Sequence, residues 1–158
     1  MRAVLISGIP ATGKTCFGEW LASYRGFQHL DLEKGYPARL NPFAMESLAF
    51  IEAARAGRPN LVVTWGFPPN PTCLAKVREL HAAGLVPWWF DGDRDAAFEC
   101  FQRRPDHPGS VSDWARQLML IQAAWPEIVG LYDDRRIDVI GAGPTYLDRE
   151  EIFARMFP

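Results

Sequence analysis

A glycine-bounded loop that directly follows a short apolar run constrains the fold more than any other feature of this chain. Residues 3–7 (AVLIS) form a continuous apolar run, which is typical of a strand buried on both faces. The residues from Gly8 to Thr15 then read GIPATGKT and fit the pattern G-x-x-x-x-G-K-[ST]. Residues 14–24 place apolar side chains on one stripe of a helix, which Gly26 ends. This order predicts a buried strand, a tight loop and an amphipathic helix in succession.

The residue types in this loop suit the binding of phosphate groups. A glycine at each end allows the backbone to curl, so that successive amides point inward at phosphate oxygens. Lys14 adds positive charge, Thr15 offers a hydroxyl to Mg²⁺, and Pro10 removes one amide donor. A chance match is disfavoured because a buried strand precedes the loop and a helix begins at it. The predicted nucleotide-binding residues of the loop are Gly8, Ile9, Pro10, Ala11, Thr12, Gly13, Lys14, Thr15 and Cys16.

The rest of the chain alternates short apolar runs with helical stretches. Further strands are predicted at 27–32, 61–64, 85–91 and 136–141. Helices are predicted at 43–56, about 72–84, 94–104, 113–134 with an interruption at Pro126, and from Asp148 onward, where Glu151 stands at capping-box spacing. Such alternation predicts an α/β fold with a mainly parallel sheet covered on both faces. Ligands of these sheets bind at the carboxyl ends of the strands.

Composition narrows the class of protein. The length of 158 residues, 48% of them hydrophobic, predicts a single domain spanning 1–158 with a real core. A net charge of −2 without any Lys/Arg block disfavours nucleic acids and membranes as partners. The three cysteines are too far apart for a disulfide framework or a zinc site. Without a signal peptide or an apolar stretch of membrane-spanning length, we expect a cytoplasmic protein. Nothing in the sequence specifies an oligomeric state.

Taken together, these segments resemble the P-loop small-molecule and nucleoside-monophosphate kinases, a group that includes shikimate, gluconate and adenylate kinases, chloramphenicol phosphotransferase and the zeta-toxin kinases. The resemblance covers most of the chain: the Walker A loop at 8–15, GFP after the third strand, WFDGD at the fourth, and an arginine-bearing segment before a lid-like loop. Only the first of these is specific. The resemblance implies a three-layer fold with five parallel strands in the order 2-3-1-4-5, a small lid at about 104–113, and ATP (or another NTP) with Mg²⁺ as phosphate donor.

Two carboxylates follow the second strand in the sequence HLDLEKG. In several of these kinases an aspartate here faces the acceptor hydroxyl, and Asp31 is the matching residue. A carboxylate across from the γ-phosphate can orient and deprotonate an alcohol. Strand alternation is expected to turn one carboxylate inward and the other outward, which favours Asp31 over Glu33. Both enter the predicted substrate site, although either one could instead close a turn with Gly35.

The segment TWGFPPN, after the third strand, departs from the pattern of adenylate kinases, which carry Asp-Gly-Phe-Pro-Arg here. Trp65 replaces the aspartate, and an indole cannot bind Mg²⁺. The metal is therefore expected to rest on Thr15, phosphates and water, with Asp31 as an outer carboxylate. Trp65, Gly66 and Phe67 are predicted to line the acceptor pocket, with plain packing of Trp65 against a neighbouring helix as the alternative. The missing arginine disfavours a nucleoside monophosphate as acceptor.

Arginines near the lid complete the predicted site. Arg103 and Arg104 end the fourth helix, where the resemblance implies contacts with adenine or phosphates, and Arg116 matches a further arginine beyond the lid. Arginines at a helix end also interact favourably with the helix dipole without any catalytic role. The predicted catalytic residues are Lys14, Asp31, Arg104 and Arg116.

These features predict an ATP-dependent phosphotransferase that moves the γ-phosphate to a hydroxyl of a small molecule, such as a sugar, a nucleoside or an antibiotic. The alternative is a nucleotide-binding regulatory or toxin-like module with little turnover, for which Trp65 at the carboxylate position is the best support. A kinase acting on nucleic-acid ends is disfavoured because the composition lacks a basic groove.

Overall fold

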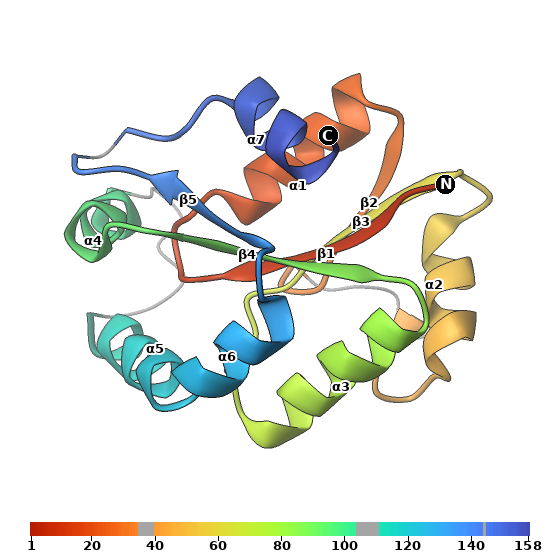
Figure 1. Ribbon diagram of the computed structural model, residues 1–158, viewed down its shortest axis with the longest axis horizontal. Coiled ribbons are helices and arrows are strands. Elements are labelled where there is room, and N and C mark those ends of the chain that lie inside the picture. Colours follow the sequence, from red (N-terminus) through yellow and green to blue (C-terminus); the bar gives the residue numbers. More distant parts are fainter. Residues whose placement is uncertain (35–39, 104–110, 144) are drawn as a thin grey trace.

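A computed structural model describes residues 1–34, 40–103, 111–143 and 145–158, which form one sheet between two layers of helices (Figure 1). The strands are β1 (Ala3–Gly8), β2 (Phe27–Asp31), β3 (Asn60–Thr64), β4 (Val86–Gly92) and β5 (Arg136–Ile140). The helices are α1 (Lys14–Tyr24), α2 (Ser47–Arg55), α3 (Pro71–Ala82), α4 (Arg94–Gln102), α5 (Val111–Ala123), α6 (Trp125–Tyr132) and α7 (Arg149–Met156). Among the described helices, none is long and apolar enough to cross a membrane.

The sheet has the predicted topology. Its five strands run parallel in the order β2-β3-β1-β4-β5, which confirms the fold class expected from the sequence. Every residue of β1 is buried, because this strand has a neighbour on each side and helices on both faces. The carboxyl end of β1, where the glycine loop begins, therefore lies at the centre of the sheet. The predicted lid falls mostly on residues 104–110, which lie outside the described residues.

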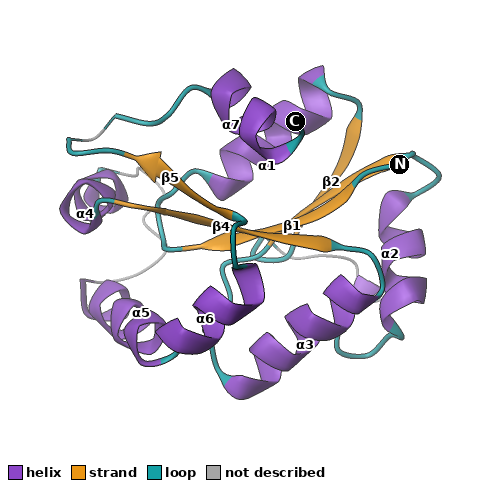
Figure 2. Cartoon of the chain, viewed as in Figure 1, coloured by secondary structure: helices purple, strands orange, loops and turns teal. Residues whose placement is uncertain are grey.

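Each face of the sheet carries its own core. Helices α1 and α7 cover one face, and α2, α3, α5 and α6 cover the other (Figure 2). Side chains of β1 alternate between the two, as a strand requires. Val4 and Ile6 pack with α1 and α7, whereas Ala3 and Leu5 join the larger core on the opposite face.

One helix boundary differs from the sequence-based expectation, and a predicted helix interruption is confirmed. The predicted helix 43–56 begins only at Ser47, because the Glu46 carboxylate caps it by accepting from the Ala49 amide at 3.0 Å. The predicted interruption near Pro126 is confirmed: α5 ends at Ala123 and α6 begins at Trp125. Proline is tolerated in the first turn of α6, because its missing N–H would have no helical partner there.

Candidate active site

The glycine loop begins at Gly8, at the end of β1, where the backbone leaves room for glycine alone. Gly8 has φ +146°, and a Cβ atom there would lie 2.1 Å from the Phe90 carbonyl oxygen of β4. The Ile9 amide donates to that same oxygen at 3.1 Å, which ties the start of the loop to the neighbouring strand. Gly13, with φ +73°, then turns the chain into α1. The loop is thus held at both ends by the sheet and the helix.

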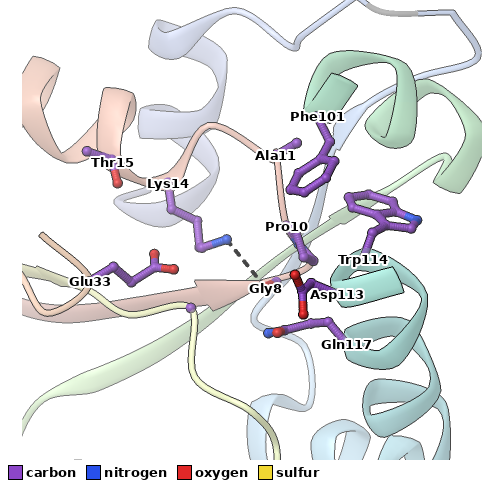
Figure 3. A pocket seen from close by; sticks show the side chains of 11 residues that line it. Gly8, Pro10, Ala11, Lys14, Thr15, Glu33, Phe101, Asp113, Trp114 and Gln117 are labelled. Atoms are coloured by element: carbon purple, nitrogen blue, oxygen red, sulfur yellow. Dashed lines mark hydrogen bonds between the residues drawn. The ribbon is translucent and has the colours of Figure 1, made fainter. Parts of the chain in front are cut away.

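Lys14 is buried and folds over this loop. Its Nζ donates to the Ile9 carbonyl at 2.9 Å and to the Gly8 carbonyl at 3.4 Å, the contact drawn in Figure 3. Thr12 closes the same turn through its hydroxyl, which donates to the Ile9 carbonyl at 2.8 Å. A positive charge is therefore held against the loop, where a phosphate group would need it.

The amides available to a ligand begin later in the loop than the sequence suggests. Pro10 has no N–H, and the Ile9 amide is already bonded to Phe90. The remaining donors belong to Ala11 and the residues that lead into α1, whose first amides have no helical partners. Ala11 itself has φ +61°, a left-handed conformation that costs a non-glycine residue on the order of 1 kcal/mol.

Asp31 lies behind Thr15. The Thr15 hydroxyl donates to one Asp31 oxygen at 2.7 Å, and the other oxygen accepts from the Glu33 amide at 2.8 Å and the Lys34 amide at 3.3 Å. This hydroxyl–carboxylate pair suits Mg²⁺, which needs few protein oxygens because it keeps waters and phosphate oxygens as ligands. Within the described residues, no cluster of three or more His, Cys, Asp or Glu side chains offers a closed metal cage.

A cavity of about 210 Å³ opens beside the loop (Figure 3). Its walls come from the loop, the segments after β2 and β3, the end of α4, and α5. It is lined by Gly8, Pro10, Ala11, Lys14, Thr15, Glu33, Gly66, Phe101, Asp113, Trp114 and Gln117. Of the predicted substrate residues, Glu33 and Gly66 line this cavity, whereas Asp31, Trp65 and Phe67 do not.

The expectation that strand alternation separates Asp31 from Glu33 is wrong. Residues two apart in a strand share a face, and β2 in any case ends at Asp31. Beyond it the chain bends, and the Asp31 side chain holds the bend by accepting from two following amides. Glu33 is thereby turned into the cavity, where its carboxylate rests on Gly66: a Cβ there would lie 2.4 Å from Glu33 Oε1.

Trp65 packs beside the cavity. Its half-buried ring lies between Phe43 and Phe67, at centroid distances of 5.6 Å and 4.7 Å. The aromatic wall of the cavity comes instead from Phe101 and Trp114, whose centroids are 5.1 Å apart. The place of Trp114 directly after the lid segment is a sequence signal for a cavity residue. Phe101, Asp113 and Gln117 carry no such signal.

His29, on β2, links this strand to β3 and to α1. Its Nε2 lies 2.9 Å from the Thr64 hydroxyl of β3, and Gly18 packs against the ring so closely that a Cβ would lie 2.5 Å from it. Burial is the largest influence on its pKa and lowers it, whereas nearby Asp31 acts in the opposite direction. The fold therefore stabilises the neutral imidazole, and this contribution is present above the ordinary histidine pKa and is lost as the pH falls.

The predicted arginines are separated in the structure. Arg103 caps the end of α4, pairs with Glu99 at 3.1 Å and lines a second cavity. Arg116 is exposed on α5, pairs with Asp113 at 3.0 Å and lines neither cavity. Arg104 lies outside the described residues, so its predicted role rests on sequence alone.

The second cavity, of about 430 Å³, lies on the other side of the loop. It is lined by Thr12, Gly13, Cys16, Phe17, Phe90, Cys100, Arg103, Tyr146, Leu147, Arg149 and Ile152. Tyr146 comes from the segment after β5, and its hydroxyl donates to the Ala11 carbonyl at 2.5 Å. This bond joins the chain after β5 to the glycine loop, a contact that no local sequence pattern indicates.

Comparison of the sequence with models of protein families and with curated proteins finds no match. Solved structures do match. A gluconokinase from Sinorhizobium meliloti 1021 has 19% identity and a TM-score of 0.60, with 98% of this chain and 88% of that chain covered. A sugar kinase from Janibacter sp. HTCC2649 has 15% identity and a TM-score of 0.61, with 99% and 92% covered. This chain shares its fold with these two kinases.

Two further solved structures match over similar lengths. A tunicamycin resistance protein from Deinococcus radiodurans has 18% identity and a TM-score of 0.56, with 99% of this chain and 96% of that chain covered. A shikimate kinase from Bacteroides thetaiotaomicron has 15% identity and the same TM-score, with 98% and 93% covered. At these identities the likeness is one of fold.

Proposed function

We propose that this protein is an ATP-dependent phosphotransferase that moves the γ-phosphate of ATP, or of another nucleoside triphosphate, to a hydroxyl group of a small molecule. The observation that carries the proposal is the meeting of Lys14, Thr15 and Glu33 around one cavity at the end of the central strand. A cation, a metal-binding hydroxyl and a carboxylate are the groups that phosphoryl transfer to an alcohol requires.

Each group has a proposed task. Lys14 and the loop amides stabilise the charge on the transferring phosphoryl group. Thr15, held by Asp31, would hold Mg²⁺, which neutralises phosphate charge when bound. Both Asp31 oxygens are engaged by other groups, so we assign the contact with the acceptor hydroxyl to Glu33, which faces the cavity.

The second cavity is the proposed site for the nucleoside half of the donor. It adjoins the loop through Gly13 and Cys16 and carries the guanidinium groups of Arg103 and Arg149. Guanidinium planes can stack on a base or bond to phosphate oxygens. We propose that Arg104 and Arg116, from the two sides of the lid segment, add charge over the phosphates. The acceptor then enters the first cavity from the side of β2, β3 and α5.

Asp31→Asn tests the metal side of this proposal. Asparagine keeps the shape of the side chain and can still bond to Thr15, but it removes a charge from the metal's surroundings. We expect the Mg²⁺ concentration for half-maximal phosphoryl transfer to rise roughly 10- to 100-fold, as for other supporting groups around a metal. Nucleotide affinity measured without Mg²⁺ should stay within about twofold of the wild type.

Asp134→Asn is the matched control, because Asp134 is exposed in the turn after α6 and pairs with its chain neighbour Arg135 at 3.7 Å. A Mg²⁺ dependence that is the same in Asp31→Asn, Asp134→Asn and the wild type would separate Asp31 from the metal site.

Gly66→Ala tests the position of the Glu33 carboxylate. The new methyl group would overlap Glu33 Oε1, and this flexible side chain would swing away from the cavity edge. We expect kcat for acceptor phosphorylation to fall about tenfold or more, while the free energy of unfolding changes by only about 1 kcal/mol. Gly130→Ala on α6 is the control, since its Cβ would meet nothing within 4 Å. Equal kcat values for the two variants would remove the Glu33 carboxylate from acceptor binding.

A second candidate function is a nucleotide-binding module with little turnover. The observation that favours it is Trp65 at the end of β3, where adenylate kinases carry a carboxylate. Nucleotide titration with and without Mg²⁺, followed by a screen of alcohols with labelled ATP, separates the two functions. Binding that is indifferent to Mg²⁺, together with no transfer to any alcohol, supports the module and contradicts the kinase.

A further inference from the structure

The first cavity has a phosphate side and an acceptor side. The glycine loop, with Lys14 and Thr15, forms the phosphate side. The acceptor side is lined by Glu33, Gly66, Phe101, Asp113, Trp114 and Gln117. Figure 3 shows Glu33 at one margin and the three α5 residues at the opposite one, with Lys14 between them. A molecule bound here would touch both margins.

The acceptor side carries two carboxylates, Glu33 and Asp113, and among the described lining residues the one cation is Lys14 on the phosphate side. Asp113 is paired with Arg116 at 3.0 Å, so the carboxylate charge that a ligand meets on the acceptor side is mainly that of Glu33. Within the described part of the chain, Glu33 forms no ion pair, and its neighbour Lys34 is bonded to Glu19 at 3.0 Å. A carboxylate or phosphate group on the acceptor would meet the Glu33 carboxylate with like charge.

The hydrogen-bonding groups on this side are mainly acceptors. Gln117 places its amide nitrogen 3.5 Å from the Phe67 carbonyl, an arrangement that leaves its own carbonyl oxygen to accept from a ligand. When it is ionised, the Glu33 carboxylate also acts only as an acceptor. A ligand that satisfies both margins must therefore carry donors, such as hydroxyl or ammonium groups, on opposite edges.

The remaining walls are flat and apolar. Phe101 and Trp114 are both buried, and the ring of a third residue, Phe98, packs against Trp114 at a centroid distance of 5.5 Å. Such a surface suits a ring laid against it, and the donors required on opposite edges make that ring one that carries hydroxyl or ammonium groups. The volume of about 210 Å³ lies below the range of drug-sized ligand sites, which begins near 300 Å³, so the bound part of the acceptor is small.

We infer that the acceptor is a small polyhydroxylated ring compound without an anionic group, in a neutral or an amino-bearing form. This inference rests on the proposed phosphotransfer. In the reaction, the bond between the γ-phosphorus and its bridging oxygen to the β-phosphate breaks, and a bond forms from an acceptor hydroxyl oxygen to that phosphorus. The hydroxyl proton passes to the Glu33 carboxylate, and the products are the nucleoside diphosphate and a phosphate monoester.

The first test uses matched sets of three compounds: a hexose, the amino sugar and the uronic acid of the same configuration. Each is incubated with the full-length protein, Mg²⁺ and ATP labelled in its γ-phosphate, and the labelled product is separated and quantified. We expect kcat/KM for the neutral or amino member to exceed that for the acid at least about tenfold in every set that reacts. The neutral and amino arms then show which of the two forms is preferred.

Preferential labelling of the acids would overturn the inference on charge and leave the phosphotransferase intact. Labelling of none of the compounds, nor of any other alcohol in a broader panel, would overturn the proposed phosphotransferase and with it the inference. The two failures are therefore distinguishable in one experiment.

The second test changes the charge of the α5 margin. Gln117→Arg puts a cation on the acceptor side, and we expect it to shift the ratio of kcat/KM values toward the uronic acid at least about tenfold. Gln122→Arg makes the same change on the same helix at an exposed residue outside the cavity, and the ratio should stay as in the wild type. Thermal melting confirms that both variants fold. A ratio unmoved by Gln117→Arg would show that α5 does not select the acceptor.

Discussion

Replacing Lys14 with methionine should lower kcat for phosphoryl transfer about 100- to 1,000-fold while the fold stays intact. Methionine has nearly the same length and fills the same buried space, but it removes the positive charge that Lys14 holds against the Gly8 and Ile9 carbonyls. In the proposed reaction, that charge would act where negative charge develops on the transferring phosphoryl group. Steady-state kinetics with saturating nucleotide measure the effect, and nucleotide titration separates it from weakened binding.

Lys76→Met provides the control for this substitution. Lys76 lies on α3, is also largely shielded from solvent, and pairs with Glu79 far along the chain from the glycine loop. Its loss should leave kcat within about twofold of the wild type. Comparable activity in Lys14→Met and Lys76→Met would mean that the loop does not act on a transferring phosphate.

Gly8→Ala is expected to have the largest effect on stability. The added methyl group would lie 2.1 Å from the Phe90 carbonyl oxygen, an atom fixed in the backbone of β4, and the φ of +146° is one that alanine rarely adopts. Overpacking and backbone strain together should cost about 3 kcal/mol or more. For a chain of this size that corresponds to a fall in Tm of roughly 6–12 °C.

The control variant is Gly141→Ala, in the chain after β5, where an added Cβ meets nothing within 4 Å. Its Tm should stay within about 2 °C of the wild type. If Gly8→Ala melts at the same temperature, the loop does not lie against β4 as described.

The sequence could predict the central part of the fold because each signal there is local. The apolar run of β1, the glycine loop and the stripe of α1 follow one another without interruption, and helix caps such as Asp93, which accepts from the Ala96 amide, act within a few residues. The order of the strands followed from the resemblance that the loop supports, and the structure confirms it.

The candidate site was harder to predict where it depends on contacts between segments that are distant in the sequence. Glu33 faces the cavity because the Asp31 side chain bends the chain after β2, a turn that strand alternation does not describe. Gln117 reaches the cavity because α5 forms one wall of it beside the end of β1, a fact of packing that the helical pattern of 113–134 does not contain. Trp65 was expected on the cavity wall, and two neighbouring rings hold it beside the cavity instead.

The bond from Tyr146 to the Ala11 carbonyl joins two parts of the proposed donor site that are distant in the sequence. The peptide that Tyr146 holds belongs to the same loop that would hold the phosphates, so a shift of the segment after β5 would be passed on to that loop. A base that fits poorly against Tyr146 would disturb the alignment of the γ-phosphate as well as its own contacts. Selectivity among ATP, GTP and pyrimidine triphosphates would then emerge as differences in turnover, even between donors that bind with similar strength.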